Sequence, residues 1–414
     1  MDRRSRRNRT GGAAPPVDTH PPESTLDPRS RCPFRGAGRP DRGVSTDHPA
    51  PQGQLPMSDH EPDLQCLLDW LAIDSTTGRE RAFLERLEED LGRRGLRCTR
   101  QAVSPGRWNL VAAPPANTKL LFSTHVDTVP PHFGPRRDGA ATRARGACDT
   151  KGGLFAMLRA WHRLPEDLRR VTGFLLVVGE EVNHDGAIRA AELSFPDLRA
   201  ILLCEPTRGR VALGQKGIVR LRLRATGVAG HSAFPEAGRS AVPPLLDALD
   251  ALRRHPWPGD DTLGDTDVNI GVLTAGPAAN IFAPEASAEL LFRIVTPADE
   301  VLNTIRSLIP DGVVLDIVST NDPMQLLPVP GEDTCIIPFN TDAPYLRHLA
   351  PVVLAGPGDI RSAHSPDEIL TDRDLENGVE QYARIASWLL TRAERPAPQS
   401  RSGNSTAAGG REFS

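Results

Sequence analysis

The sequence predicts an α/β fold in which a mostly parallel sheet carries an inserted, smaller α+β domain. Between residues 119 and 205, apolar strands alternate with helical patterns, as in sheets whose parallel strands are joined by helices. After Pro206 the strands instead alternate apolar and polar residues, as in "VRLRLRATG". This second pattern is typical of an antiparallel sheet with one solvated face. The first pattern returns in "PVVLAG" and a last helical segment.

The elements of the larger domain follow from apolar spacing. Residues 62–94 carry apolar side chains at helical spacing and predict two amphipathic helices. Strands and helices then alternate: strands at 108–113 and 119–124, a helix at 152–164, a strand at 171–179, a helix at 187–193, a strand at 198–205 and, much later, a helix at 371–392.

The inserted domain is predicted to place two helices on an antiparallel sheet. Its expected elements are strands within 210–228, a helix at 239–254, strands at 268–274 and 286–295, a helix at 297–309 and a strand at 313–318. We therefore predict an inserted domain at 208–318 and a larger domain formed by 58–207 and 319–394.

Both ends of the chain are predicted to be disordered. Residues 1–56 carry ten Arg against six acidic residues, many Pro and Gly, and almost no periodic apolar residues, a composition that cannot build a core. The segment "RRSRRNR" resembles a twin-arginine signal or a basic arm, but no apolar segment follows it. We predict that residues 1–57 are a disordered extension, or follow from an upstream start that precedes a true start at Met57, and that residues 395–414 are a disordered tail.

Composition excludes several classes of protein. A formal net charge of −4 argues against a dedicated nucleic-acid binder. No apolar run approaches the roughly 20 residues that a membrane span needs. The six cysteines have no CxxC spacing, which indicates reduced thiols and a cytoplasmic protein.

Acidic residues cluster where the predicted strands end. Glu180 and Glu181 follow the apolar run "FLLVV", and Glu205 follows "AILLC". One acid at a strand terminus is usually only solvated, but three carboxylates at neighbouring termini repel one another unless a cation lies between them. The adjacent pair also raises the question of which glutamate would stay free of a metal.

Two histidines and two further acids complete this set. His125 and Asp127 share a face if the strand continues, so that Asp127 would hold the imidazole of His125 for a metal. Asp149 lies in a glycine-rich loop, where it either caps the following helix or points toward the sheet edge at which α/β folds bind ligands. His364 by itself is an exposed loop histidine. Together, imidazole and carboxylate groups suit zinc, with cobalt or manganese as alternatives.

Six motifs, in this order, resemble those of the dinuclear-zinc amidohydrolase superfamily of acetylornithine deacetylase, succinyl-diaminopimelate desuccinylase and aminoacylase. They are "STHVDTVP", "RARGACDTKGG", "VVGEEVNHDGA", "LCEPT", "GVAGHSAFPEAG" and "AHSPDE". The resemblance spans residues 62–392. It implies two zinc ions per subunit, with Asp149 bridging them, His125 and Glu205 completing one site, and Glu181 and His364 completing the other.

The same resemblance implies the catalytic roles. Glu180 would be the general base that activates a water shared by the zinc ions, Asp127 would orient His125, and the peptide bond after Asp149 would be cis. His231 of the inserted lid and dimerisation domain would reach the partner subunit's site and stabilise the oxyanion, so a homodimer is implied.

Substrate contacts are also implied by the resemblance. Asn280 and Arg293 match positions that hold the carboxylate end of the substrate, although Leu291 replaces the acidic residue often found two positions before the arginine. His184 is expected to be a solvent-facing turn residue. Cys148 and Cys204 are expected to pack inward as small apolar groups rather than bind zinc.

The expected function is hydrolysis of the amide bond of a small N-acyl amino acid. The closest similarity is to acetylornithine deacetylases, which implies deacetylation of N-acetyl-L-ornithine in arginine biosynthesis. Succinyl-diaminopimelate desuccinylase, a dipeptidase or an aminoacylase are alternatives with the same catalytic core. A metal-binding homologue without activity is the non-enzyme alternative.

Overall fold

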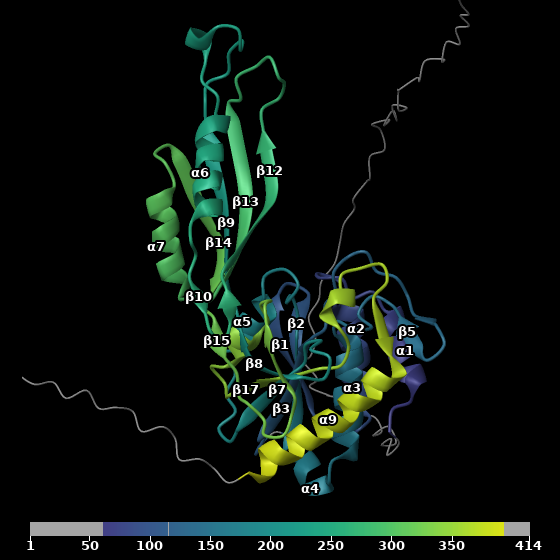
Figure 1. The fold of residues 1–414 in the computed structure, drawn as a ribbon. Coiled ribbons are helices and arrows are strands. Elements are labelled where there is room, and N and C mark those ends of the chain that lie inside the picture. Colours follow the sequence, from purple (N-terminus) through teal and green to yellow (C-terminus); the bar gives the residue numbers. More distant parts are fainter. Residues whose placement is uncertain (1–60, 115, 393–414) are drawn as a thin grey trace, which may run out of the picture. The chain divides into compact units, whose positions relative to one another are not determined.

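The larger domain is built around a six-stranded sheet in which four neighbouring strands run parallel (Figure 1). The computed structural model describes residues 61–114 and 116–392, so the two predicted disordered ends lie outside the described residues. The strand order is β1 (Cys98–Ser104), β2 (Arg107–Ala112), β6 (Thr172–Val177), β3 (Leu120–His125), β7 (Ala200–Leu203) and β17 (Val352–Leu354). Strands β6, β3, β7 and β17 are parallel, and β2 and β1 extend the sheet antiparallel.

Helices cover both faces of this sheet, which is why its parallel strands are continuous apolar runs. One face packs against α1 (Leu64–Ala72), α2 (Arg81–Gly92), α3 (Lys151–Arg163) and α9 (Asp372–Thr391). The other face packs against α5 (Asp185–Ala190), α8 (Ala343–Leu346) and a small sheet of β15 (Met324–Gln325), β8 (Val211–Gln215) and β16 (Thr334–Ile337). The short helix α4 (Glu166–Arg169) leads into β6.

A buried lysine fixes α1 to the start of α3. The Lys151 Nζ donates hydrogen bonds to the carbonyl oxygens of Trp70 and Ile73, at 3.1 and 2.7 Å, and lies 4.3 Å from the centre of the Phe83 ring. Burial lowers the pKa of Lys151 to about 7. These contacts satisfy carbonyl groups at the end of α1, where a helix has no internal partners for them.

A three-stranded sheet joins two segments that are far apart in sequence. Strand β18 (Ile369–Thr371) pairs with β5 (Ala141–Arg143), which pairs with β4 (Arg136–Arg137). The turn η2 (Ile360–Ser362) precedes β18. This pairing brings the segment that contains His364 beside the loop that contains Asp149.

The inserted domain is a four-stranded antiparallel sheet with two helices on one face (Figure 1). The strand order is β12 (Asp267–Ala275), β13 (Glu285–Ile294), β9 (Gly217–Thr226) and β14 (Val313–Asn321), and the helices are α6 (Val242–Arg254) and α7 (Ala298–Leu308). The pair β10 (Gly259–Asp260) and β11 (Gly264–Asp265) and the turn η1 (Pro235–Ala237) lie in its connections. The alternation in β9 follows this arrangement, because its leucines face the helices while its arginines are exposed.

The observed strands suggest other boundaries for the inserted domain than the predicted 208–318. Strand β8 lies inside the predicted insertion, yet Val211 and Ala212 pack with the two cores of the larger domain. At the other end, β14 continues beyond residue 318 to Asn321. We therefore propose that the inserted domain runs from Gly217 to Asn321.

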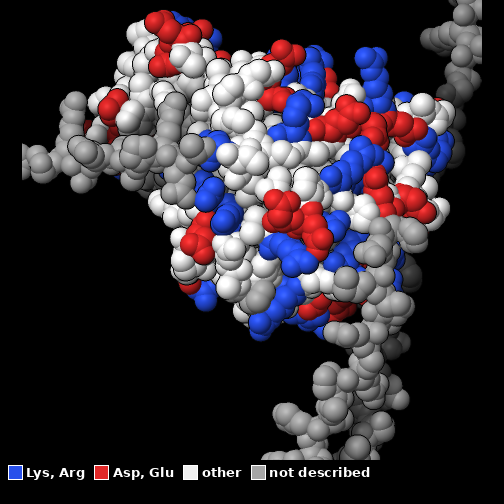
Figure 2. Space-filling model, turned by 90° about the horizontal axis from the view of Figure 1, so that it is seen from below, with Lys and Arg blue, Asp and Glu red and all other residues white. Residues whose placement is uncertain are grey.

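Charged side chains of both signs are mixed on the surface that Figure 2 displays. On that face, Lys and Arg lie among Asp and Glu rather than forming a continuous basic strip, as expected from 49 basic and 53 acidic residues. Among the described residues, no helix combines the length and the apolar composition that crossing a bilayer requires.

Candidate metal centre

The candidate residues meet at the carboxyl edge of the six-stranded sheet. His125 is the last residue of β3, Glu180 and Glu181 follow β6, and Glu205 follows β7. Because these three strands are parallel, their ends lie at one edge, where α/β sheets bind their ligands. Asp149 reaches the same edge from the loop before α3.

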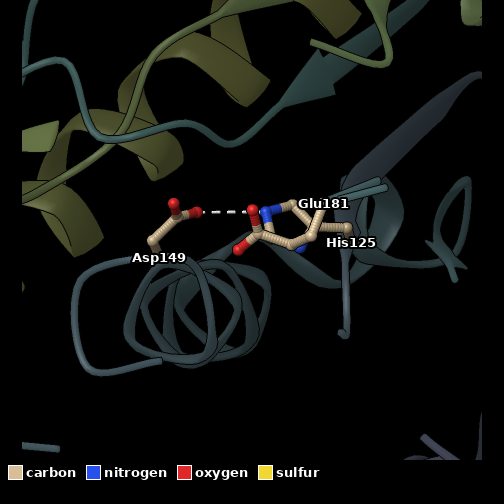
Figure 3. Close-up of side chains that lie close together, drawn as sticks. All are labelled: His125, Asp149 and Glu181. Carbon is tan, nitrogen blue, oxygen red and sulfur yellow. Dashed lines mark hydrogen bonds and ion pairs between the residues drawn. The ribbon is translucent and has the colours of Figure 1, made fainter. Parts of the chain in front are cut away.

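Asp149 contacts both histidines of the cluster, and Figure 3 shows its carboxylate pointing toward His125. Its Oδ1 is 3.0 Å from His125 Nε2, and its Oδ2 is 3.3 Å from His364 Nε2. The same His364 nitrogen is 3.0 Å from Glu181 Oε2. One ligand atom each from His125, Asp149 and Glu181 lies within 4.8 Å of the others, a spacing that could hold a metal ion.

The residues present fit a divalent metal. Glu181 Oε1 and Glu205 Oε1 are buried and have no hydrogen-bond partner among the described residues. A buried carboxylate oxygen without a donor is unfavourable, and a cation would satisfy both atoms. Two imidazoles and three carboxylates form a donor set that suits zinc, manganese or cobalt.

The electrostatics of the side chains point the same way. Burial raises the pKa of Glu205 well above its usual value, and the nearby Glu180 raises it further. Burial and the charge of Asp149 raise the pKa of Glu181. Burial also raises the pKa of Asp149, but hydrogen bonds from His125 and His364 outweigh this and hold it well below its usual range. The site is thus short of positive charge.

Asp127 acts on the site differently from the expectation that it shares a strand face with His125. Strand β3 ends at His125, and the backbone oxygen of Asp127 is the atom 2.9 Å from His125 Nδ1; the nearer carboxylate oxygen is 3.6 Å away. The carboxylate also accepts hydrogen bonds from the backbone N–H groups of Glu180 and Glu181 and from Thr77 Oγ1. Asp127 therefore connects His125 to the glutamate pair.

The glutamate pair is oriented by a turn rather than by strand alternation. Strand β6 ends at Val177, and residues 180–183 form the turn that leads to α5. Gly179 has a φ of 79°, and a Cβ there would lie 2.0 Å from Asp185 Oδ1, so this turn requires glycine. Burial raises the pKa of the Glu180 carboxyl well above its usual value.

Asp149 does not cap the helix that follows it. Thr150 is the N-cap of α3, and the Asp149–Thr150 peptide bond is cis, as the resemblance implies. A Cβ on Gly153 would lie 2.1 Å from Cys204 Sγ, so only glycine lets α3 approach the end of β7. Cys204 is buried at this contact and Cys148 is buried next to Gly358, which confirms the expectation that both cysteines pack inward.

His184 contradicts the expectation of a solvent-facing turn residue. Its side chain is 13% exposed, its Nδ1 is 2.9 Å from Asp342 Oδ1, and Asn340 Nδ2 donates to its Nε2 at 2.8 Å. Glu180, His184 and Asp342 offer ligand atoms within 4.8 Å of one another. Both ring nitrogens are engaged in hydrogen bonds, however, so this histidine has no free lone pair for a metal.

Two of the three predicted residues of the inserted domain lie apart from this cluster. His231 and Asn280 are exposed on neighbouring loops, where Ser232 N–H donates to the Asn280 carbonyl oxygen at 3.0 Å. Within the described chain, neither side chain contacts the metal cluster by a hydrogen bond or an ion pair. Arg293 is partly buried and close enough to Glu180 to interact with it electrostatically: burial lowers the pKa of Arg293, and Glu180 opposes this effect.

Sequence similarity identifies the family. The chain is 32% identical over 354 residues to a peptidase M20 domain-containing protein of Schizosaccharomyces pombe, covering 82% of this chain and 87% of the relative. This chain belongs to the M20 peptidase family. A probable carboxypeptidase of Aspergillus flavus is also similar, with 31% identity over 373 residues, covering 78% of this chain and 86% of that protein.

Further comparisons agree with the M20 assignment. Residues 213–312 match the family model of a peptidase dimerisation domain. A tripeptidase from Staphylococcus aureus has the same fold, with a TM-score of 0.65 at 21% identity over 80% of this chain and 98% of that chain. An M20 family metallo-carboxypeptidase from Sulfolobus solfataricus gives a TM-score of 0.64 at 16% identity, covering 79% and 98%. As an M20 peptidase, this chain is a metal-dependent hydrolase of amide bonds.

Metal binding is expected to release protons. Hydrogen bonds to Asp149 and Glu181 raise the pKa of His364 to about 10, and those of His125 to Asp127 and Asp149 raise its pKa well above the usual value despite burial. His364 is therefore protonated at pH 7 without metal, and the raised pKa of His125 favours its protonated form, whereas a ligand must be neutral. Affinity should rise with pH by about one log unit per pH unit for each proton displaced.

Calorimetric titration of zinc in buffers of different ionisation enthalpy measures this release. His364→Gln should release about one proton fewer. His184→Gln is the matched control and should leave the number unchanged. A wild-type protein that binds metal without proton release would contradict the prediction.

Proposed function

We propose that this chain hydrolyses the amide bond that precedes a residue with a free carboxylate, in an N-acyl amino acid or a short peptide. The observation that carries the proposal is Arg293. In the described part of the chain its guanidinium has no ion pair or hydrogen bond, although it is partly buried and lies near Glu180. A cation in this situation favours an anionic substrate group, and Arg matches a carboxylate with two parallel hydrogen bonds.

N-acetyl-L-ornithine is the specific substrate that we propose first, on the motifs quoted above. Such a reaction would belong to arginine biosynthesis, and the absence of CxxC spacing supports a cytoplasmic location. The names of the relatives favour a second candidate, a short peptide cleaved at its carboxyl end, because the Aspergillus flavus protein is called a probable carboxypeptidase. Both substrates present a carboxylate next to the scissile amide.

The proposed mechanism assigns one task to each side chain. We propose that His125, Asp149, Glu181, Glu205 and His364 hold two zinc ions, which would supply Lewis-acid polarisation of the carbonyl and lower the pKa of water. Glu180 accepts the proton of the attacking water and returns it to the departing amine. Asp127 keeps the backbone of Glu180 in place through its hydrogen bond to the Glu180 N–H. Arg293 and Asn280 hold the substrate carboxylate, and His231 donates to the oxyanion.

A panel of substrates tests the proposed function. It contains N-acetyl-L-ornithine, N-acetyl-L-citrulline, N-succinyl-diaminopimelate and dipeptides, each assayed with added zinc or cobalt. The Glu180→Gln protein, purified in parallel, controls for contaminating hydrolases. Turnover of at least one carboxylate-ended compound by the wild type alone is expected. Binding of two metals per subunit without any turnover would favour the inactive homologue.

Arg293→Ala is expected to raise KM for carboxylate-ended substrates by about 10- to 100-fold, with a smaller change in kcat, because a charge-assisted pair is worth about 1.5–3 kcal/mol. Steady-state kinetics on a dipeptide and on its C-terminal amide measure this. For the wild type, replacing the acid by the amide should raise KM by about the same factor as Arg293→Ala raises KM for the acid. If Arg293→Ala discriminates acid from amide as the wild type does, Arg293 does not bind the carboxylate.

We also propose a homodimer in which His231 acts in the partner's site. The match to a peptidase dimerisation domain and the exposed Val272 and Leu273 on the edge strand β12 support this assembly. His231→Ala and Glu180→Ala homodimers should each be nearly inactive. A co-expressed mixture should recover activity, since heterodimers contain one site with both residues intact. Mass spectrometry shows whether heterodimers form. If they form and the mixture stays inactive, His231 does not act in the partner's site.

A further inference from the structure

Glu368 lies under the loop that carries Asp149, four residues after His364. Its side chain is fully buried. Its Oε1 accepts hydrogen bonds from the backbone N–H groups of Gly146, Cys148 and Asp149, each at 3.0 Å. Its Oε2 accepts from Arg145 Nη1 at 2.7 Å.

These contacts satisfy a segment that has no secondary structure of its own. Residues 145–150 form consecutive turns and are buried. The N–H groups of Arg145 and Ala147 donate to backbone oxygens, whereas those of residues 146, 148 and 149 donate to the Glu368 carboxylate. Each buried donor left unpaired would be unfavourable by about 1–3 kcal/mol. One carboxylate takes three of them, and the buried guanidinium of Arg145, 3% exposed, compensates its charge.

We propose that Glu368 is a positioning residue of the metal centre. It holds the backbone of residues 145–149 so that the Asp149 carboxylate stays between His125 and His364. Because Glu368 follows His364 on the same segment, it fixes the two segments to each other, together with the pairing of β18 and β5. Four donors occupy its oxygens, so Glu368 is not itself a metal ligand. This inference rests on the proposed role of Asp149 as a ligand.

The test is the metal affinity of the folded, metal-stripped protein. Zinc is titrated against a chromophoric chelator, so no substrate is needed. Outer partners of metal ligands typically change metal affinity by 10- to 100-fold, and we expect a loss in this range for Glu368→Ala. Glu368→Gln keeps an acceptor for the N–H groups but loses the ion pair with Arg145, so its loss should be smaller. In both variants kcat should fall more than KM rises, and excess zinc should restore part of the activity.

Glu332→Ala is the matched control. Glu332 is also mostly buried and paired, with Arg384 and Gln381, but it contacts no residue of the metal cluster within the described chain. It should lower the free energy of unfolding in urea without changing zinc affinity. The proposal is overturned if the Glu368 variants bind zinc within twofold of the wild type, or if Glu332→Ala weakens zinc binding equally. If Glu368→Ala does not fold, Glu368→Gln decides by the same criteria.

The failure of this inference is distinguishable from the failure of the proposed function. An inactive substrate panel leaves the zinc titration fully interpretable. If Asp149→Ala binds zinc as tightly as the wild type, the ligand role fails, and the inference about Glu368 fails with it.

Discussion

Replacing Glu180 by Gln is expected to lower kcat by about 10²–10⁴-fold, the range typical of a lost general acid–base group, while two metals remain bound. The amide has nearly the same shape as the carboxylate but cannot take a proton from water. Burial raises the pKa of the Glu180 carboxyl, which moves it toward the range where a group can both accept and return a proton.

Kinetics and elemental analysis of the same preparation separate this role from that of a ligand. Glu192→Gln, an exposed glutamate paired with Arg189, is the control and should change neither quantity. Loss of metal from Glu180→Gln would make Glu180 a ligand. Near-normal turnover would exclude it as the base.

Replacing Asp149 by Ala is expected to remove the metals and reduce activity to background. The carboxylate lies between His125 and His364, and no other described group contacts both imidazoles. Residues that only hydrogen-bond to metal ligands typically change metal affinity 10- to 100-fold when they are lost. Removing a direct ligand should have a larger effect, so we expect metal affinity to fall more than 100-fold.

The Asp149→Ala protein should still fold when it is metal-free. Without metal, the substitution removes the favourable contacts of Asp149 with His125 and His364, but it also removes the charge that repels Glu181 and Glu205, so the two effects oppose each other. In urea, the metal-stripped variant should therefore have a free energy of unfolding similar to that of the stripped wild type. Elemental analysis of the purified variant should give less than roughly half a metal ion per subunit, as weak residual binding would leave. Two retained metals would show that Asp149 is not the shared ligand.

Local patterns were sufficient to predict the main elements and the convergence of the site. The apolar runs before His125, Glu181 and Glu205 are buried parallel strands, and parallel strands must end at a common edge. His364 reaches that edge through the pairing of β18 with β5, which spans more than 200 residues of sequence. Only the resemblance linked His364 to the site, because a loop histidine has no periodicity of its own.

The side-chain contacts made by loop residues could not be predicted from the sequence. His184 was expected to face solvent, yet Asn340 and Asp342, about 160 residues away, hold both ring nitrogens. Asp127 was expected to face His125 along a strand, but the strand ends at His125. The Asp127 carboxylate lies 3.6 Å from His125 Nδ1 and accepts hydrogen bonds from the backbone of the glutamate pair. In both cases a tertiary hydrogen bond decides the orientation, and no local pattern encodes it. Similarly, the sequence shows Glu368 only as the last acid of "AHSPDE" and does not reveal that its carboxylate accepts hydrogen bonds from the backbone of residues 146–149.

The most direct test of the account is a zinc titration of chelator-stripped protein, with hydrolysis of N-acetyl-L-ornithine and of a dipeptide followed at each step. We expect no activity without metal, and a rise on at least one of the two substrates that saturates at two equivalents of zinc per subunit. Activity in the fully stripped protein, or two tightly bound zinc ions without hydrolysis of any carboxylate-ended amide, would contradict the account.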